Sequence, residues 1–203
     1  MRVYFVKRVV LRWTLLTMFG LAAGVVSALI LESPIDAVVG MMLVTPVLTL
    51  LAGAVLGASQ WLQLRSLLSQ TRLWILATCV GLGIGLALGV VTVEQFGRLL
   101  TGHRPHVIQL SVFARAISFA ILGSITGLSV GATQWIVVLR RHLQARKWIA
   151  TSAVSLGIAF SSSSLIVDAV IGGIAHPLGL IGFLLLAGLI FGVGTAQPLL
   201  RAT

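Results

Sequence analysis

The residues best able to act on a solute form three small groups within otherwise apolar sequence. Gln60 and Gln134 can donate and accept hydrogen bonds, Thr45-Pro46 interrupts a long apolar run, and four consecutive serines occupy positions 161–164. A proline favours a helix kink, and interrupted membrane helices are where transporters often bind their substrates. One hypothesis is therefore a polar path for a small solute, lined by Gln60, Gln134, Thr45, Pro46, Ser161, Ser162, Ser163 and Ser164.

Each of these groups also has a structural interpretation. A glutamine inside a membrane bundle can bond to a neighbouring helix, which contributes about 0.6–2 kcal/mol. Serine hydroxyls can bond back to the carbonyl one turn earlier and soften the helix. The glutamines belong to a repeated motif, Gly53, Gly57, Gln60 and Trp61, then Gly127, Gly131, Gln134 and Trp135. Its tryptophans, with Trp13, Trp74 and Trp148, suit the interfacial belt of a membrane protein.

Groups that could perform acid–base, nucleophilic or metal chemistry are sparse. We expect no acid or histidine near a helix centre, where proton-coupled transporters usually need one. Arg115 and Asp168 near helix ends either extend toward the membrane surface or pair with each other across the bundle. His103, His106, His142 and His176 fall in loops. We therefore predict no catalytic residues, no cofactor, no metal site and no enzymatic activity.

The elements that must position these residues are membrane helices. Of 203 residues, 58% are hydrophobic and 9% are charged, whereas soluble domains carry roughly a quarter charged residues. A helix needs about 20 apolar residues to cross a bilayer. The sequence predicts an all-α membrane bundle in one domain, 1–203, with six helices at about 11–31, 37–63, 73–93, 111–139, 148–171 and 178–200. The basic start followed by an apolar run is interpreted as a retained first helix rather than a cleaved signal peptide.

A spacing of 74 residues relates the middle of the chain to itself. It separates Trp61 from Trp135 and Trp74 from Trp148, so the predicted repeat is a two-helix hairpin over 37–110 and 111–184. Trp13, Gly20 and Gly24 precede Trp74, Gly81 and Gly85 by 61 residues each. The first and sixth helices could therefore complete a third, circularly permuted hairpin, which predicts a pseudo-threefold ring. Its weakest point is Thr195, which stands where the other copies have glutamine.

The basic residues predict an orientation and argue against a nucleic-acid partner. The net charge is +10, but eleven of the 14 lysines and arginines fall on the side of the two termini. Positive charge marks cytoplasmic loops and meets anionic lipid there, so both termini are predicted to be cytoplasmic. No basic face with interleaved aromatic residues, as nucleic-acid binding requires, lies outside the apolar runs.

Glycines one turn apart recur along the chain and bear on packing. They let two helix backbones approach closely, which is how membrane helices associate. The simpler interpretation is compact packing within the bundle. The other is an interface for a homo-oligomer or a larger membrane complex. Cys79, the one cysteine, is expected to be a small core residue.

The repeated motif also resembles a family of small polytopic membrane proteins of cyanobacteria and other bacteria. The resemblance rests on Gly-x-x-x-Gly-x-x-Gln-Trp, a basic turn, and then Trp74 with Gly81 and Gly85; the second copy departs at Ser155 and Ala159. It implies a bacterial cytoplasmic or thylakoid membrane. That family has no established activity that could be assigned to this chain.

Two functions follow from these observations. The first is a non-enzymatic structural or accessory protein that packs through its glycine-rich faces. It predicts a dry bundle centre and glycine faces that are exposed to lipid or to partners. The alternative is a small-solute transporter or channel, which predicts that the second and fifth helices face a shared polar cavity.

Overall fold

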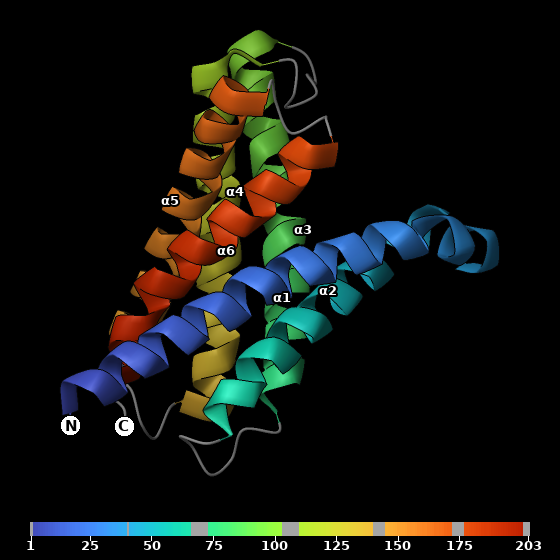
Figure 1. Cartoon of the computed structure of the whole chain (residues 1–203). Helices are drawn as coiled ribbons and strands as arrows, with labels where there is room; N and C mark the ends of the chain where they lie inside the picture. The colour runs from blue at the N-terminus through green and yellow to red at the C-terminus, as the bar shows by residue number, and fades with distance from the viewer. Residues whose placement is uncertain are drawn as a thin grey trace.

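The computed structural model describes residues 2–39, 41–65, 73–102, 110–139, 145–171 and 177–200, and within these ranges it is a bundle of long helices (Figure 1). All six are long and apolar enough to cross a membrane, so the chain is an integral membrane protein with an all-α fold. The helices are α1 (Arg2–Val39), α2 (Met41–Leu64), α3 (Trp74–Thr101), α4 (Val112–Gln134) with a π-helical turn (Trp135–Leu139), α5 (Ala145–Ile171) and α6 (Pro177–Leu200).

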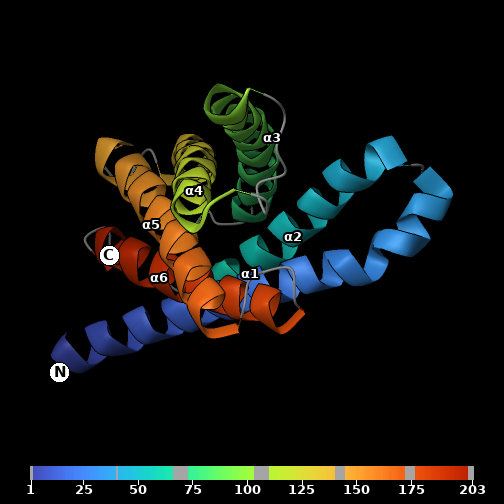
Figure 2. The same ribbon diagram turned by 90° about the horizontal axis from the view of Figure 1, so that it is seen from above.

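The helices are arranged as a closed ring. Each packs against the next along the chain, and α6 packs against α1 to complete the circuit. Figure 2 shows this order from above, with α1 and α2 extending away from the other helices toward their shared turn. We call the end where α1, α3 and α5 begin the basic end, because it carries Arg12, Arg65, Arg146 and Lys147.

Three predicted helix ends were wrong. The first helix begins at Arg2 rather than near residue 11. The predicted break at Glu32-Ser33-Pro34 lies inside α1, which continues to Val39. A proline removes one backbone donor and can bend a helix without ending it, and Figure 2 shows the last part of α1 turning from its earlier course. Helix α3 passes Glu94 and ends at Gly102, whose φ of 74° provides the left-handed cap that glycine adopts readily.

Aliphatic and aromatic side chains fill the interior beyond the basic end. Phe183 of α6 contacts Phe119 of α4 in a tilted arrangement and Phe160 of α5 in an edge-to-face arrangement, at 5.4 Å and 5.3 Å between ring centroids. Leu56 of α2 and Leu156 of α5 belong to the same buried cluster. Cys79 is also buried, as predicted for a small core residue.

The glycines bring neighbouring backbones together inside the chain. A Cβ added at Gly53 would lie 2.7 Å from the Cα of Cys79, and one at Gly57 would lie 2.9 Å from the Cα of Ile75. In α4, a Cβ at Gly131 would lie 3.1 Å from the Cα of Ile149. The predicted compact packing is confirmed at these positions, and these glycine faces are occupied by the chain's own helices.

Candidate functional site

Three tryptophans close the basic end of the bundle. Trp74 and Trp148 lie in the first turns of α3 and α5, Trp13 lies about three turns into α1, and each is at most 1% exposed. Trp74 lies between the other two, with ring centroids 6.2 Å from Trp13 and 6.1 Å from Trp148 in edge-to-face geometry. Such pairs are the favourable arrangement for aromatic rings. The prediction that these three form a lipid-facing belt was wrong, because they face one another inside the protein.

The remaining members of this layer come from the even-numbered helices. Leu64, Leu139 and Ala196, at the ends of α2, of the π-helical turn and of α6, are buried against the tryptophans. Trp61 and Trp135 are half-buried at its edge. The guanidinium carbon of Arg65 lies 5.3 Å from the centre of the Trp61 ring, within cation–π range. We call this set the tryptophan layer.

Gln60 and Gln134 hold neighbouring helices together directly below the tryptophan layer. The Trp74 indole N–H donates to Oε1 of Gln60 at 3.1 Å, and Nε2 of Gln60 donates to Oγ1 of Thr17 at 3.3 Å. One repeat later, Nε2 of Gln134 donates to Oγ1 of Thr78 at 3.0 Å. Both glutamines are buried. The predicted role in bonding between helices is confirmed, and these amides are engaged with protein groups.

The third position of the layer is occupied by Thr195 of α6. The Trp13 indole N–H donates to its Oγ1 at 3.0 Å, and that hydroxyl donates to the carbonyl of Phe191 at 2.8 Å. Thr195 thus accepts from the tryptophan of α1 as Gln60 accepts from that of α3. Within the described residues, the Trp148 N–H and the hydroxyl of Ser152 have no hydrogen-bond partner.

The π-helical turn Trp135–Leu139 accounts for a difference in register. Trp61 and Trp135 are 74 residues apart, yet the buried leucines that follow them, Leu64 and Leu139, are 75 apart. A π-helical turn holds one more residue than an α-helical turn. It therefore returns Leu139 to the place in the tryptophan layer that Leu64 occupies at the end of α2.

The other predicted path residues lie elsewhere. Pro46 is exposed near the start of α2, and the side chain of Thr45 lies outside the described set. In α5, Ser162 donates to the carbonyl of Ile158 at 2.6 Å, which is the predicted back-bonding. Ser164 likewise donates to the carbonyl of Ser161 at 2.9 Å, and Ser163 and Ser164 are buried. The glutamines and the serines are therefore separate features, one in the layer at the basic end and the other further along α5.

An ion pair joins α4 and α5 near the opposite end. Arg115 Nη2 lies 2.8 Å from Asp168 Oδ2, and these side chains are 13% and 10% exposed. Of the two interpretations of these residues, pairing across the bundle is confirmed. The histidines at 103, 106, 142 and 176 lie outside the described residues.

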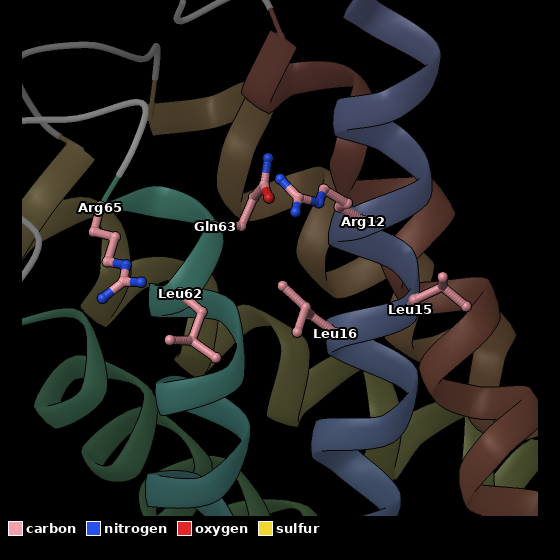
Figure 3. Close-up of a pocket in the computed structure, with 6 residues that line it drawn as sticks. All are labelled: Arg12, Leu15, Leu16, Leu62, Gln63 and Arg65. Atoms are coloured by element: carbon pink, nitrogen blue, oxygen red, sulfur yellow. The ribbon is translucent and has the colours of Figure 1, made fainter.

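Among the residues that the structure describes, grooves open between adjacent helices at the periphery, and two of them bear on the predicted sites. One, of about 390 Å³, lies between α4 and α5 and includes Ser161 and Ser162. The other, of about 530 Å³, lies between α1 and α2 at the basic end and carries Arg12, Gln63 and Arg65 (Figure 3). Neither of these two grooves is formed by α2 and α5 together, the pair that the transporter hypothesis predicts.

Sequence reasoning missed three hydroxyls of this site. Thr17 and Thr78 are 61 residues apart and Thr78 and Ser152 are 74 apart, which are the spacings of the repeat. That recurrence was the available signal, since the same intervals relate Trp13, Trp74 and Trp148.

Comparison of the chain with family models, curated proteins and solved structures finds no match. The resemblance to the cyanobacterial membrane family therefore stays a prediction.

Proposed function

We propose that this integral membrane protein is a non-enzymatic scaffold, an accessory component made of three like hairpins in a closed ring. The hairpins are α2–α3, α4–α5 and the permuted pair α6–α1, related by a pseudo-threefold axis along the membrane normal. Both termini lie in the cytoplasm in this proposal, and the membrane is a bacterial cytoplasmic or thylakoid membrane.

Equivalent backbone contacts in the three hairpins support the threefold arrangement. Gly57 approaches Ile75 in the first hairpin, and Gly131 approaches Ile149 in the second. In the third, a Cβ at Gly192 would lie 2.8 Å from the Cα of Thr14, which precedes Ile75 by 61 residues. The contacts between hairpins recur as well, because Gly24 approaches Ala52 and Gly85 approaches Thr126.

The observation that carries the scaffold proposal is the tryptophan layer. Three buried indoles pack in edge-to-face contact at the basic end, and the polar side chains beside them bond mainly to one another. A transport path would need these groups to face a solute. Dense aromatic packing with internally bonded amides instead favours a rigid, closed body.

The surface that a partner protein would contact differs from the glycine-rich faces that the sequence predicts. Gly53, Gly57, Gly127 and Gly131 face neighbouring helices of the same chain, so a partner would meet the outer apolar surface instead. That surface includes Leu99 and Phe113, which are strongly exposed on α3 and α4. In this proposal, lipid and one or more membrane proteins cover the outer surface.

Extraction from native membranes tests the proposal. The full chain, extracted in a mild detergent and separated by native electrophoresis, should migrate with stoichiometric protein partners identified by mass spectrometry. A chain stripped with a harsher detergent provides the monomer standard. Migration only as a monomer, from membranes in which known complexes remain assembled, would contradict the accessory role.

A small-solute transporter is the second candidate, because one ion pair lies within two membrane spans. Arg115 and Asp168 lie inside the apolar spans of α4 and α5, close to their ends, and ionisable groups within spans commonly mark transport pathways. Flux assays in proteoliposomes distinguish the candidates. A scaffold should pass no solute above protein-free liposomes. Flux that falls in the Asp168→Asn variant would favour transport.

A further inference from the structure

We infer that the groove between α1 and α2 at the basic end binds an acidic phospholipid. Arg12, Leu15 and Leu16 line it from α1, Leu62 and Gln63 line it from α2, and Arg65 lines it from the residue after α2. Figure 3 shows the side chains of Arg12 and Gln63 pointing toward one another, with the leucines beneath them along the two helices. This site is independent of whether the bundle acts as a scaffold or a transporter.

The charge of the groove selects an anionic ligand. Arg12 and Arg65 are exposed, and both line the same groove. The four acids of the chain, Glu32, Asp36, Glu94 and Asp168, lie toward the other ends of their helices. Glu32 follows Arg12 by 20 residues, about 30 Å along a helix. Neither Arg12 nor Arg65 therefore has a nearby carboxylate, from its own helix or the adjoining one, that could neutralise its charge.

The position of the groove at the membrane surface favours a lipid over a soluble anion. The apolar span of α2 ends at Leu64, so Arg65 lies at the membrane surface where phosphates are found. Leu15 and Leu62 are exposed on the membrane side of the two arginines. A phospholipid can place its phosphate beside Arg12 and the Gln63 amide while an acyl chain covers these leucines.

Two side chains of the groove, Gln63 and Arg65, are restrained in the lipid-free protein. Gln63 is only 6% exposed, so its amide is held in place at the groove wall. Arg65 lies over the Trp61 ring at 5.3 Å, which restricts a long and otherwise flexible side chain. The volume of about 530 Å³ suits a headgroup and the first part of one chain. The remainder of the lipid would lie in the bilayer.

Native mass spectrometry of the purified full chain tests the site. Phosphatidylglycerol and phosphatidylcholine with identical acyl chains are added separately, and the bound fraction is measured. We expect phosphatidylglycerol to be retained roughly twenty-five-fold more tightly, since each of the two arginines at the surface strengthens such binding about fivefold. The double variant Arg12→Gln/Arg65→Gln should lose this preference.

A matched control removes the same charge elsewhere at the basic end. Arg146 and Lys147 are exposed at the start of α5, outside the groove. The Arg146→Gln/Lys147→Gln variant should keep the preference for phosphatidylglycerol. Equal losses in the two double variants, or none in Arg12→Gln/Arg65→Gln, would overturn the proposal.

A second measurement does not depend on charge variants. A photoreactive amino acid replacing Leu62 should cross-link phosphatidylglycerol, whereas one replacing Leu76, equally lipid-accessible on α3, should cross-link it far less. Deacylated glycerophosphoglycerol should fail to compete at concentrations similar to the lipid. Competition by that headgroup, or by inorganic phosphate, would identify a soluble anion site and contradict the lipid proposal, as would a co-purifying acidic protein cross-linked at Leu62.

Discussion

In hairpin α2–α3 the indole of Trp74 donates to Gln60, whereas in hairpin α4–α5 the indole of Trp148 has no hydrogen-bond partner among the described residues. Both tryptophans are nonetheless buried and share an edge-to-face contact. The glutamine of the second hairpin, Gln134, directly precedes the π-helical turn. Trp148 is therefore as buried as Trp74 although its indole N–H makes no hydrogen bond to the described residues. Packing of the rings accounts for the position of both tryptophans, and the hydrogen bond adds to it only at Trp74.

Removing a central ring should have the largest effect. Trp74→Ala should lower the free energy of unfolding by at least about 3 kcal/mol, because a buried indole leaves a large cavity. Trp148→Ala should cost about 1 kcal/mol less, since Trp148 has one fewer ring contact and no hydrogen bond to lose. Unfolding by SDS in mixed micelles, followed by near-ultraviolet circular dichroism, measures both. Equal losses of unfolding free energy in the two variants would mean that the extra ring contact and the hydrogen bond of Trp74 add no stability.

The opposite end offers a second contrast between the hairpins. Asp168 pairs with Arg115, whereas Glu94, 74 residues earlier, is exposed and has Met41 at the position equivalent to Arg115. Asp168→Asn should destabilise by about 2 kcal/mol, because it leaves a mostly buried guanidinium without its counter-charge. Glu94→Gln should change the same unfolding curve by less than about 0.5 kcal/mol. A comparable loss in the two variants would argue that the ion pair adds little.

Glycine substitutions test what the hairpins have in common. Gly53→Ala and Gly127→Ala should each destabilise by about 1–3 kcal/mol, because the new Cβ would meet backbone of α3 or α5. Gly83→Ala is the control, since its Cβ would find only a leucine methyl 4.0 Å away. There the better helix propensity of alanine should leave stability unchanged or raise it. The thermal midpoint in detergent reports all three, and a destabilised Gly83→Ala protein would undermine the packing argument.

The smallest expected difference separates the two glutamines. Gln60→Leu removes two hydrogen bonds, one from Trp74 and one to Thr17, and should destabilise by about 1–2 kcal/mol. Gln134→Leu removes its bond to Thr78 and should cost about 0.6 kcal/mol. A double-mutant cycle with Trp74→Phe should show coupling for Gln60 and none for Gln134. Coupling of similar size for both would contradict the asymmetry of the hairpins.

Apolar length predicted the membrane spans well, because a bilayer imposes one thickness on every helix. The spacing of glycines and glutamines also predicted contacts that the structure contains, since residues one turn apart share a helix face. The burial of Trp13, Trp74 and Trp148 was missed. An indole at the membrane surface can pack against either lipid or protein. The position of a tryptophan in the sequence therefore does not show whether its side chain faces outward or inward.

Other errors have local causes. The sequence predicts a helix end at Pro34, although a proline can also bend a helix that neighbouring turns sustain, as it does within α1. The π-helical turn was visible only as a one-residue difference between the Leu64–Leu139 and Trp61–Trp135 intervals. Thr195 differs in type from the glutamines of the other copies, yet its hydroxyl accepts from the indole of Trp13 as Gln60 accepts from that of Trp74.

Cysteine cross-linking in native membranes tests the central claim, that three like hairpins close into a ring within one chain. In a Cys79→Ser background, the pairs Gly57→Cys/Ile75→Cys, Gly131→Cys/Ile149→Cys and Thr14→Cys/Gly192→Cys occupy equivalent positions in the three hairpins. A Cβ at the glycine would lie 2.8–3.1 Å from the partner Cα in each pair, so the added side chain crowds the three hairpins alike and the comparison among them holds. The account predicts that all three form intramolecular disulfides to similar extents, while Thr14→Cys/Gly83→Cys forms none. Failure of the Thr14–Gly192 pair, or its formation only between separate chains, would contradict the closed ring.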